Sequence, residues 1–202
     1  MRWRRYGEHA ALLDCASLDQ MSAARATLTE AALDGVTEIV PGARTLLVVA
    51  TPGSGALEAA RALLASADLA HPPAGPPGEV VLDVHYSGED LSLVAEDAGL
   101  TVDEVVTLHT SATYTVAFTG FAPGFGYLAG LPAELQQPRL ASPRTRVPAG
   151  AVAIADEYTG VYPRESPGGW RLIGHTEATL FDPSAEQPAL FTPGLRVRFR
   201  SV

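Results

Sequence analysis

The sequence predicts an α+β protein in which a small two-layer α/β domain precedes a β-barrel or β-sandwich. A run of four prolines and two glycines at 71–78 suits neither a helix nor a central strand, so it marks a linker. Before this run helical and strand patterns alternate, whereas after Tyr114 only short β-rich segments occur between Gly-rich and Pro-rich turns. We therefore expect an N-terminal domain over 1–70, a linker over 71–79 and a second domain over 80–202.

The first domain follows from a β-α-β-β-α order of patterns, which is typical of helices covering one face of a short sheet. Met21, Ala24 and Leu28 recur at helical spacing, and Gly35 is a plausible stop for their helix. In order, the expected elements are a strand at 11–14, a helix at 18–33, strands at 36–40 and 45–50, and a helix at 55–69.

The second domain begins with a strand at 80–86 and a helical hairpin. An amphipathic helix over 89–98 is closed by Gly99, and a capping box at Thr101–Glu104 starts a second helix that runs to His109. The strand candidates that follow are YTVAF, AVAIA, GVYP, WRLIG, TLFD and RVRFRSV, and their close spacing favours a barrel or sandwich.

Composition excludes several classes of function. The 202 residues are 47% hydrophobic and 18% charged with a net charge of −9, which indicates a globular protein and argues against nucleic acid as a partner. There is no lysine, so a Schiff-base lysine and a P-loop lysine are excluded. Residues 1–100 hold 6 Arg and 14 acids, and residues 101–202 hold 8 and 9, so the second half is the better place for an anionic ligand.

Cysteine usage and hydropathy predict a cytoplasmic protein. The single Cys15 forms no internal disulfide, and we expect a small buried residue there rather than a catalytic thiol. No apolar stretch follows the charged N-terminus and none reaches the ~18 residues of a membrane span, so no membrane partner is expected.

Three segments dense in glycine and proline are candidates for a binding site, because such loops hold a preset shape. They cover 118–128, 142–150 and 158–170. In the first, Pro123-Gly124 forces a turn, and Phe121, Phe125 and Tyr127 either line a pocket or plug one end of the barrel.

Arginines and glycines in the other two segments suggest an anion site. Arg144 and Arg146 lie two apart, so in an extended segment they share a face and would grip a carboxylate or phosphate, unless they are solvated surface residues. The amides of Gly168 and Gly169 allow close approach of a ligand, or they form a tight turn that delivers Trp170 to the core.

Two histidines are the remaining candidates for chemistry. His109 ends an apolar helix face and His175 ends a strand; each is either structural or titrates near neutrality. No grouping has metal-ligand spacing, so we expect no metal site, and G-x-S-x-G, Walker A and G-x-G-x-x-G are absent.

Six ordered blocks resemble the family called 5-oxoprolinase B subunit, allophanate hydrolase subunit 1 or KipI. They are His85-Tyr-Ser-Gly-Glu-Asp-Leu91, Glu104-Val-Val-Thr-Leu-His109, Gly120-Phe-Ala-Pro-Gly-Phe-Gly-Tyr-Leu128, Pro143-Arg-Thr-Arg-Val-Pro-Ala-Gly150, Thr159-Gly-Val-Tyr-Pro163 and Ser166-Pro-Gly-Gly-Trp-Arg-Leu-Ile-Gly174. The resemblance implies a cyclophilin-like β-barrel of the carboxyltransferase subdomain type in the second domain. It also implies a hetero-oligomer with a KipA-type partner, the C subunit of the family's complexes, and with an amidohydrolase-like subunit.

The function implied is a subunit, inactive on its own, of an ATP-dependent 5-oxoprolinase that opens 5-oxoproline to glutamate. ATP, bound with Mg²⁺, would be shared with the partner subunit. Arg144 would anchor an anionic group, His109 would transfer a proton or donate a hydrogen bond, and Phe125 with Tyr127 would form the pocket wall. The family's motif positions fall on His109, Gly120, Phe121, Pro123, Gly124, Phe125, Tyr127, Arg144, Pro148, Gly150, Gly160, Tyr162, Pro163, Pro167, Gly168, Gly169 and Trp170, and Arg146 lies beside them.

His175 stands where the family leads us to expect Arg or Lys, so this position loses a constant charge and becomes pH-sensitive. Two alternative functions stay open at this point. One is a KipI-like inhibitor that grips the helical bundle of a sensor histidine kinase. The other is a carboxyltransferase component of a urea carboxylase or allophanate hydrolase system that works with a biotin carrier.

Overall fold

The computed structural model describes residues 1–70 and 78–202, which fall into two compact units on either side of residues 71–77. Most of the expected linker at 71–79 lies outside the described residues. Its end needs correction, because Glu79 already belongs to the first strand of the second unit. Each unit is described by itself.

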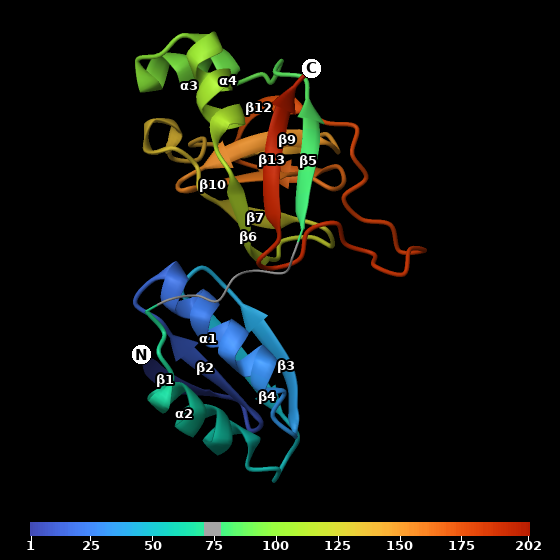
Figure 1. The fold of residues 1–202 in the computed structure, drawn as a ribbon. Helices are drawn as coiled ribbons and strands as arrows, with labels where there is room; N and C mark the ends of the chain where they lie inside the picture. The colour runs from blue at the N-terminus through green and yellow to red at the C-terminus, as the bar shows by residue number, and fades with distance from the viewer. Residues whose placement is uncertain (71–77) are drawn as a thin grey trace. The chain divides into compact units, whose positions relative to one another are not determined.

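The first unit is a four-stranded antiparallel sheet with two helices on one face (Figure 1). The strand order is β1-β2-β4-β3. Side chains of Leu13, Leu46 and Val48 alternate toward the helices and pack against Met21 and Leu64. The elements are β1 (Arg2–Tyr6), β2 (Ala10–Asp14), α1 (Leu18–Ala31), β3 (Val36–Pro41), β4 (Thr45–Ala50) and α2 (Ala56–Ser66).

The expected elements of this unit are present, but one strand is additional and both helices are shorter than expected. Helix α2 ends at Ser66, three residues before the expected end at 69. Strand β1 was not expected from the sequence; it forms because all five residues pair in register with β2. Helix α1 ends at Ala31, short of Leu33, because Ala32 adopts the left-handed conformation at φ 43° and ends the helix before Gly35. Cys15 is free and half-buried, and its burial raises the pKa of the thiol.

The second unit is built on a seven-stranded, nearly closed barrel-like sheet with the order β12-β9-β10-β7-β6-β13-β5. All pairs are antiparallel except β13 with β5, which are parallel. A separate two-stranded antiparallel sheet of β8 and β11 lies outside this sheet. The strands are β5 (Glu79–Val84), β6 (Tyr114–Thr119), β7 (Gly126–Ala129), β8 (Arg144–Val147), β9 (Ala151–Ala155), β10 (Tyr158–Val161), β11 (Ser166–Gly168), β12 (Arg171–His175) and β13 (Arg196–Ser201).

Alternating apolar residues fill the interior of the barrel. Val152 and Ile154 of β9, Leu128 of β7, and Val197 and Phe199 of β13 meet there in one core. The expected strand at 179–182 does not form, and only an isolated bridge joins Phe181 to Ala189. Strand β7 begins inside the segment 118–128, for which the sequence predicts a loop, and ends at Ala129.

Two helices and a 3₁₀ turn cover one end of the barrel (Figure 1). They are α3 (Leu91–Ala98), α4 (Val102–Ser111) and η1 (Ala133–Leu135). The predicted capping box is confirmed: Thr101 and Glu104 satisfy each other's backbone amides at the start of α4. Helix α3 begins at Leu91 instead of Glu89, with Asp90 at its N-cap.

The lengths and hydropathies of the described helices can be compared with those of membrane-spanning helices. None of the helices within 1–70 and 78–202 is both long and apolar enough to cross a membrane.

Candidate functional site

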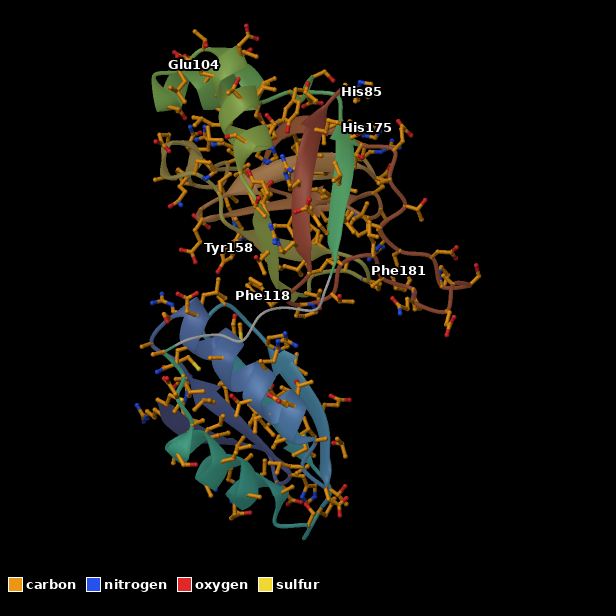
Figure 2. All side chains as sticks on the ribbon, viewed as in Figure 1. His85, Glu104, Phe118, Tyr158, His175 and Phe181 are labelled. Carbon is orange, nitrogen blue, oxygen red and sulfur yellow. The ribbon has the colours of Figure 1, made fainter. Side chains whose placement is uncertain are left out.

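Seven aromatic side chains form a continuous cluster on the outer face of the barrel. Leu128 and Val161 point into the core, so their strand neighbours point outward. Phe125 is the centre, with ring centroids 5.4 Å from both Tyr162 and Trp170 and 5.3 Å from Phe121. This aromatic cluster comprises Phe118, Phe121, Phe125, Tyr127, Tyr158, Tyr162 and Trp170, of which Phe118 and Tyr158 are marked in Figure 2.

Glycines let the rings pack this closely. A Cβ on Gly160 would lie 3.0 Å from the ring of Phe125 and 3.1 Å from that of Trp170. A Cβ on Gly168 would collide with the hydroxyl of Tyr162, whereas on Gly169 its nearest neighbour would be 3.5 Å away. Gly168 is therefore required by packing, and Gly169 is not.

The loop that carries Pro123 and Gly124 presents one exposed ring. Phe121 adopts φ 66°, which is unusual for a bulky residue, and its side chain is 58% exposed while Phe125 is buried. Gly124, at φ 84°, packs against Leu180 and Phe181, where a Cβ would meet the Phe181 side chain at 2.7 Å. The strained conformation thus holds Phe121 at the surface above the buried rings.

Arg144 lies beside this cluster and is held by two carboxylates. Its Nη2 donates to Asp90 Oδ1 over 2.7 Å, and its Nε donates to Glu89 Oε2 over 3.3 Å. Asp90 Oδ2 also accepts from the amide of Leu172 at 2.7 Å. The hydrogen bond and charge of Asp90 raise the pKa of Arg144 above its usual value. Nη1 of Arg144 is buried and has no partner among the described residues, so its two N–H groups are unsatisfied but closed off from solvent.

The two predicted anion-binding arginines do not converge. Nε of Arg146 donates to Glu165 Oε2 at 2.6 Å, and its side chain is 76% exposed, in contrast to 21% for Arg144. Each guanidinium has its own carboxylate in this structure, so the expected joint grip on one anion stays a prediction.

His109 is sealed in the core between α4 and the barrel. Nδ1 accepts from the Tyr86 hydroxyl at 2.7 Å, and Nε2 lies 3.0 Å from Thr159 Oγ1. Since Thr159 donates its own proton to the carbonyl of Ala153, it accepts from Nε2–H. Burial lowers the pKa of His109 to about 3, and Phe199 stacks on the ring. Neither ring nitrogen is free for a ligand, so its expected role in proton transfer stays a prediction and its visible role is structural.

His175 ends β12 and pairs with the residue that follows β5. Its backbone forms an isolated bridge with His85, and the two are neighbours in Figure 2. Nε2 of His175 is 2.9 Å from Glu177 Oε1. No contact among the described residues joins His175 to the aromatic cluster, so the structure separates these two parts of the predicted site.

Sequence reasoning missed two charged residues that fix this region. Asp90 is 6% exposed and orients Arg144. Arg171 is 8% exposed and donates to Asp97, to Gln137 and to the carbonyl of Pro138. Each lies within one of the six family blocks, but nothing in the local pattern indicates buried polar contacts between residues 33 to 82 positions apart.

The described residues do not fit a nucleoside triphosphate by themselves. A triphosphate needs several cations or a cradle of amides, whereas Arg144 is already neutralised by two carboxylates and lysine is absent. No group of three or more His, Cys, Asp or Glu residues within 1–70 and 78–202 is placed to hold a metal ion. What this surface offers is aromatic contact area with one buried guanidinium donor.

Part of the chain is similar in sequence to curated proteins. The B subunit of 5-oxoprolinase from Escherichia coli O157:H7 is 54% identical over 112 residues, which make up 55% of this chain and 51% of that protein. Its counterpart from Haemophilus influenzae is 49% identical over 123 residues, 59% of this chain and 58% of that protein. The match thus spans only about half the length of these relatives.

Solved structures share the fold. The crystal structure of TTHA0988 superimposes with a TM-score of 0.82 at 34% identity, covering 96% of this chain and 40% of that one. The urea amidolyase of K. lactis shares the fold alone, with a TM-score of 0.75 at 18% identity over 99% of this chain and 15% of that one.

A family model matches nearly the whole chain. The model of the carboxyltransferase domain, subdomain C and D, matches residues 1–191. Together with the relatives that are named as B subunits of 5-oxoprolinase, this match confirms the resemblance seen in the six sequence blocks. The chain belongs to the family of carboxyltransferase domains, subdomain C and D.

Proposed function

We propose that this chain is the B-type subunit of an ATP-dependent 5-oxoprolinase, which hydrolyses 5-oxoproline to glutamate. The observation that carries the proposal is the identity of 46–54% to three curated proteins that are named as the B subunit of this enzyme. In this proposal the seven-stranded barrel is of the cyclophilin-like type and the complex works in the cytoplasm.

The substrate site in this proposal is the surface around Tyr162, whose ring centroid lies 6.1 Å from that of Phe121 and whose hydroxyl lies against Gly168, the strand partner of Arg144. 5-Oxoproline is a flat five-membered lactam with one carboxylate. An exposed ring at Phe121 suits its apolar face. The unsatisfied Nη1 of Arg144 is buried, so it would donate to the carboxylate or lactam oxygen only after a movement of neighbouring side chains exposes it. Tyr162, whose hydroxyl is hydrogen-bonded to the Trp170 amide, forms the floor between them.

The nucleotide and the chemistry that it drives are assigned to the assembled complex. Because the described residues do not fit a triphosphate, a KipA-type partner would hold most of the ATP, with its Mg²⁺. An amidohydrolase-like subunit would complete the assembly. This division explains why the chain would be inactive on its own.

A reconstituted complex tests the proposal. We expect 5-oxoproline-dependent ATP hydrolysis only when this chain and both partner subunits are present. Arg144→Gln should lower kcat/KM by about tenfold or more, because a hydrogen bond to a charged group is lost. Arg198→Gln, a change at an exposed arginine of β13, is the matched control and should leave the rate unchanged.

Because Arg144→Gln also breaks an ion pair, a second variant keeps the test clear of folding. Phe121→Asn suits the left-handed backbone at an exposed position, so the fold should persist while KM rises. A complete complex without 5-oxoproline-dependent ATP hydrolysis would overturn the proposal.

A carboxyltransferase component is the second candidate, favoured by the family model and by the likeness of fold to urea amidolyase. Transfer of a carboxyl group from carboxylated biotin to urea, measured with the same complex, distinguishes it from 5-oxoprolinase activity. The kinase-inhibitor function stays a prediction, and binding to a histidine-kinase dimerisation domain is its test.

A further inference from the structure

Arg139 lies in a connecting segment whose backbone is fixed on both sides. The carbonyl of Gln137 accepts from the amide of Asp156 at 2.7 Å, and the amide of Leu140 donates to the carbonyl of Gly169 at 2.8 Å. These two bonds set the place of the Arg139 backbone, although the residue belongs to neither a helix nor a strand. Its side chain therefore projects from a defined position on the surface of the second unit.

That position is close to Tyr162, around which the proposed substrate site lies. A Cβ on Gly168 would be 2.3 Å from the Tyr162 hydroxyl oxygen, and the neighbouring Gly169 accepts from the residue that follows Arg139. Burial, the largest effect, raises the pKa of Tyr162, whereas the charges of Arg139 and Arg144 both lower it. Both guanidinium groups are therefore near this hydroxyl.

The two arginines differ in how accessible their donors are. Arg144 is bound to Asp90, and its unsatisfied Nη1 is closed off from solvent. The side chain of Arg139 is 58% exposed and makes no hydrogen bond to the described residues. Its one ion pair within 1–70 and 78–202 joins Nε to Asp156 Oδ2 over 3.8 Å, and that carboxylate is 62% exposed. Such a pair contributes little, because water competes for both groups, so the donors of Arg139 are open to a ligand.

We infer that Arg139 binds the carboxylate of 5-oxoproline in the site around Tyr162, which leaves the lactam oxygen as the group for Arg144. This inference rests on the proposed 5-oxoprolinase function. A guanidinium binds a carboxylate through parallel N–H···O bonds, and Arg139 presents its fork of donors without a hydrogen-bonded protein partner among the described residues. The negative charge of the substrate is thus recognised at the surface, by an arginine that needs no movement of neighbouring side chains.

Asp156 competes with the substrate for Arg139. Its backbone is held by the carbonyl of Gln137 and adopts φ 51° in the turn between β9 and β10, so the turn and not the ion pair sets the place of its carboxylate. Asp156→Asn removes the competing charge and suits this backbone, because Asn is enriched in the left-handed region. The change should therefore free Arg139 without disturbing the fold.

Binding of two ligands to the complex of this chain with both partner subunits, measured by isothermal titration calorimetry, tests the inference. The ligands are 5-oxoproline and 2-pyrrolidone, which is the same lactam ring without the carboxylate. Arg139→Gln should weaken binding of 5-oxoproline about fivefold or more and change that of 2-pyrrolidone less than about twofold. Arg139→Lys, which keeps the charge, should lose less, and Asp156→Asn should strengthen binding of 5-oxoproline about twofold.

Arg164→Gln is the matched control for a change of charge. Arg164 is exposed, lies two positions after Tyr162 and has no ion pair among the described residues, like an arginine that only attracts anions in general. We expect its replacement to change the affinity for 5-oxoproline less than about twofold. An equal loss in Arg139→Gln and Arg164→Gln would reveal general attraction of an anion and would overturn the inference.

Other results would overturn it as well. They are parent affinity for 5-oxoproline in Arg139→Gln, an equal loss for both ligands in that variant, or weaker binding of 5-oxoproline by Asp156→Asn. Because a gain of affinity does not arise from misfolding, Asp156→Asn decides if Arg139→Gln fails to fold. A parent complex that binds no 5-oxoproline would overturn the 5-oxoprolinase proposal together with this inference, whereas an unaffected Arg139→Gln in an active complex would overturn this inference alone.

Discussion

The hydroxyl of Tyr86 lies 2.7 Å from Nδ1 of His109, so a phenol from the segment after β5 donates to an imidazole on α4. With Thr159 on the other nitrogen, the ring joins three separate segments at the barrel end. The side chain of His109 is fully buried from water. The imidazole is therefore a neutral hydrogen-bonding link, and its charged form is incompatible with the fold.

Acid should destabilise the protein through this histidine. Burial lowers the pKa of His109 from 6.5 to about 3, so below pH 6.5 the unfolded chain binds a proton that the folded chain rejects. The free energy of unfolding then falls as pH falls, by about 2 kcal/mol between pH 7 and pH 5. Urea titrations at the two pH values measure this difference. His109→Gln, which keeps a donor and an acceptor, should show a clearly smaller loss; an unchanged pH dependence would contradict the assignment.

The pair of Asp90 and Arg144 should behave as one energetic unit. Asp90→Asn leaves a largely buried guanidinium without its strongest partner, and Arg144→Gln leaves a buried carboxylate with the Leu172 amide alone. Each change should cost about 3 kcal/mol of unfolding free energy. A double-mutant cycle by chemical denaturation should give a coupling of about 1 kcal/mol or more. If the two effects are additive, the coupling free energy between Asp90 and Arg144 is zero and the prediction is wrong.

Adjacent glycines give a matched test of the aromatic cluster. Gly168→Ala forces the Tyr162 hydroxyl to move and should lower stability by about 1–3 kcal/mol, with a change in the near-ultraviolet circular dichroism of the rings. Gly169→Ala meets only ordinary contacts and should stay within about 0.5 kcal/mol of the parent. Equal effects at both positions would refute the packing role assigned to Gly168.

The buried Arg171 should matter more than its acidic partner. Arg171→Leu leaves the Gln137 side chain and the Pro138 carbonyl without their donor, which should cost about 3 kcal/mol. Asp97→Asn should cost less, about 1–2 kcal/mol: the buried guanidinium loses its carboxylate partner, but the amide oxygen of Asn can still accept from Nη1, and water reaches this side chain, which is 44% exposed. Thermal melts of both variants provide the comparison, and a larger loss for Asp97→Asn would reverse this ranking.

Local patterns predict those elements whose stability is local. The sequence predicts the capping box at Thr101, the alternating burial of β4 and the amphipathic helix α3. It does so because helix caps and periodic burial depend on residues that are neighbours in sequence. Strand β1 is not: in Arg2–Tyr6 only Trp3 packs inward, so the strand exists through its pairing with β2.

The sequence predicts the part of the candidate site that is formed by loops with restricted backbones. Phe121, Phe125, Tyr127 and Tyr162 do come together, as three dense Gly/Pro segments suggest. The carboxylates that occupy Arg144 are not predictable, since Asp90 looks like an ordinary helix-capping acid. Its side chain makes no cap because Arg144 and Leu172 bind it.

The parallel pairing of β5 with β13 sets the order in which the second unit assembles. These strands are joined residue by residue, yet Asp83 and its partner Arg200 are 117 positions apart. A contact at such separation closes a long loop, which slows folding and delays it during synthesis until β13 has left the ribosome. Before then β5 lacks β13, the one strand that pairs with it within the described residues, and the early chain is exposed to mispairing for the time that translation of the intervening residues takes.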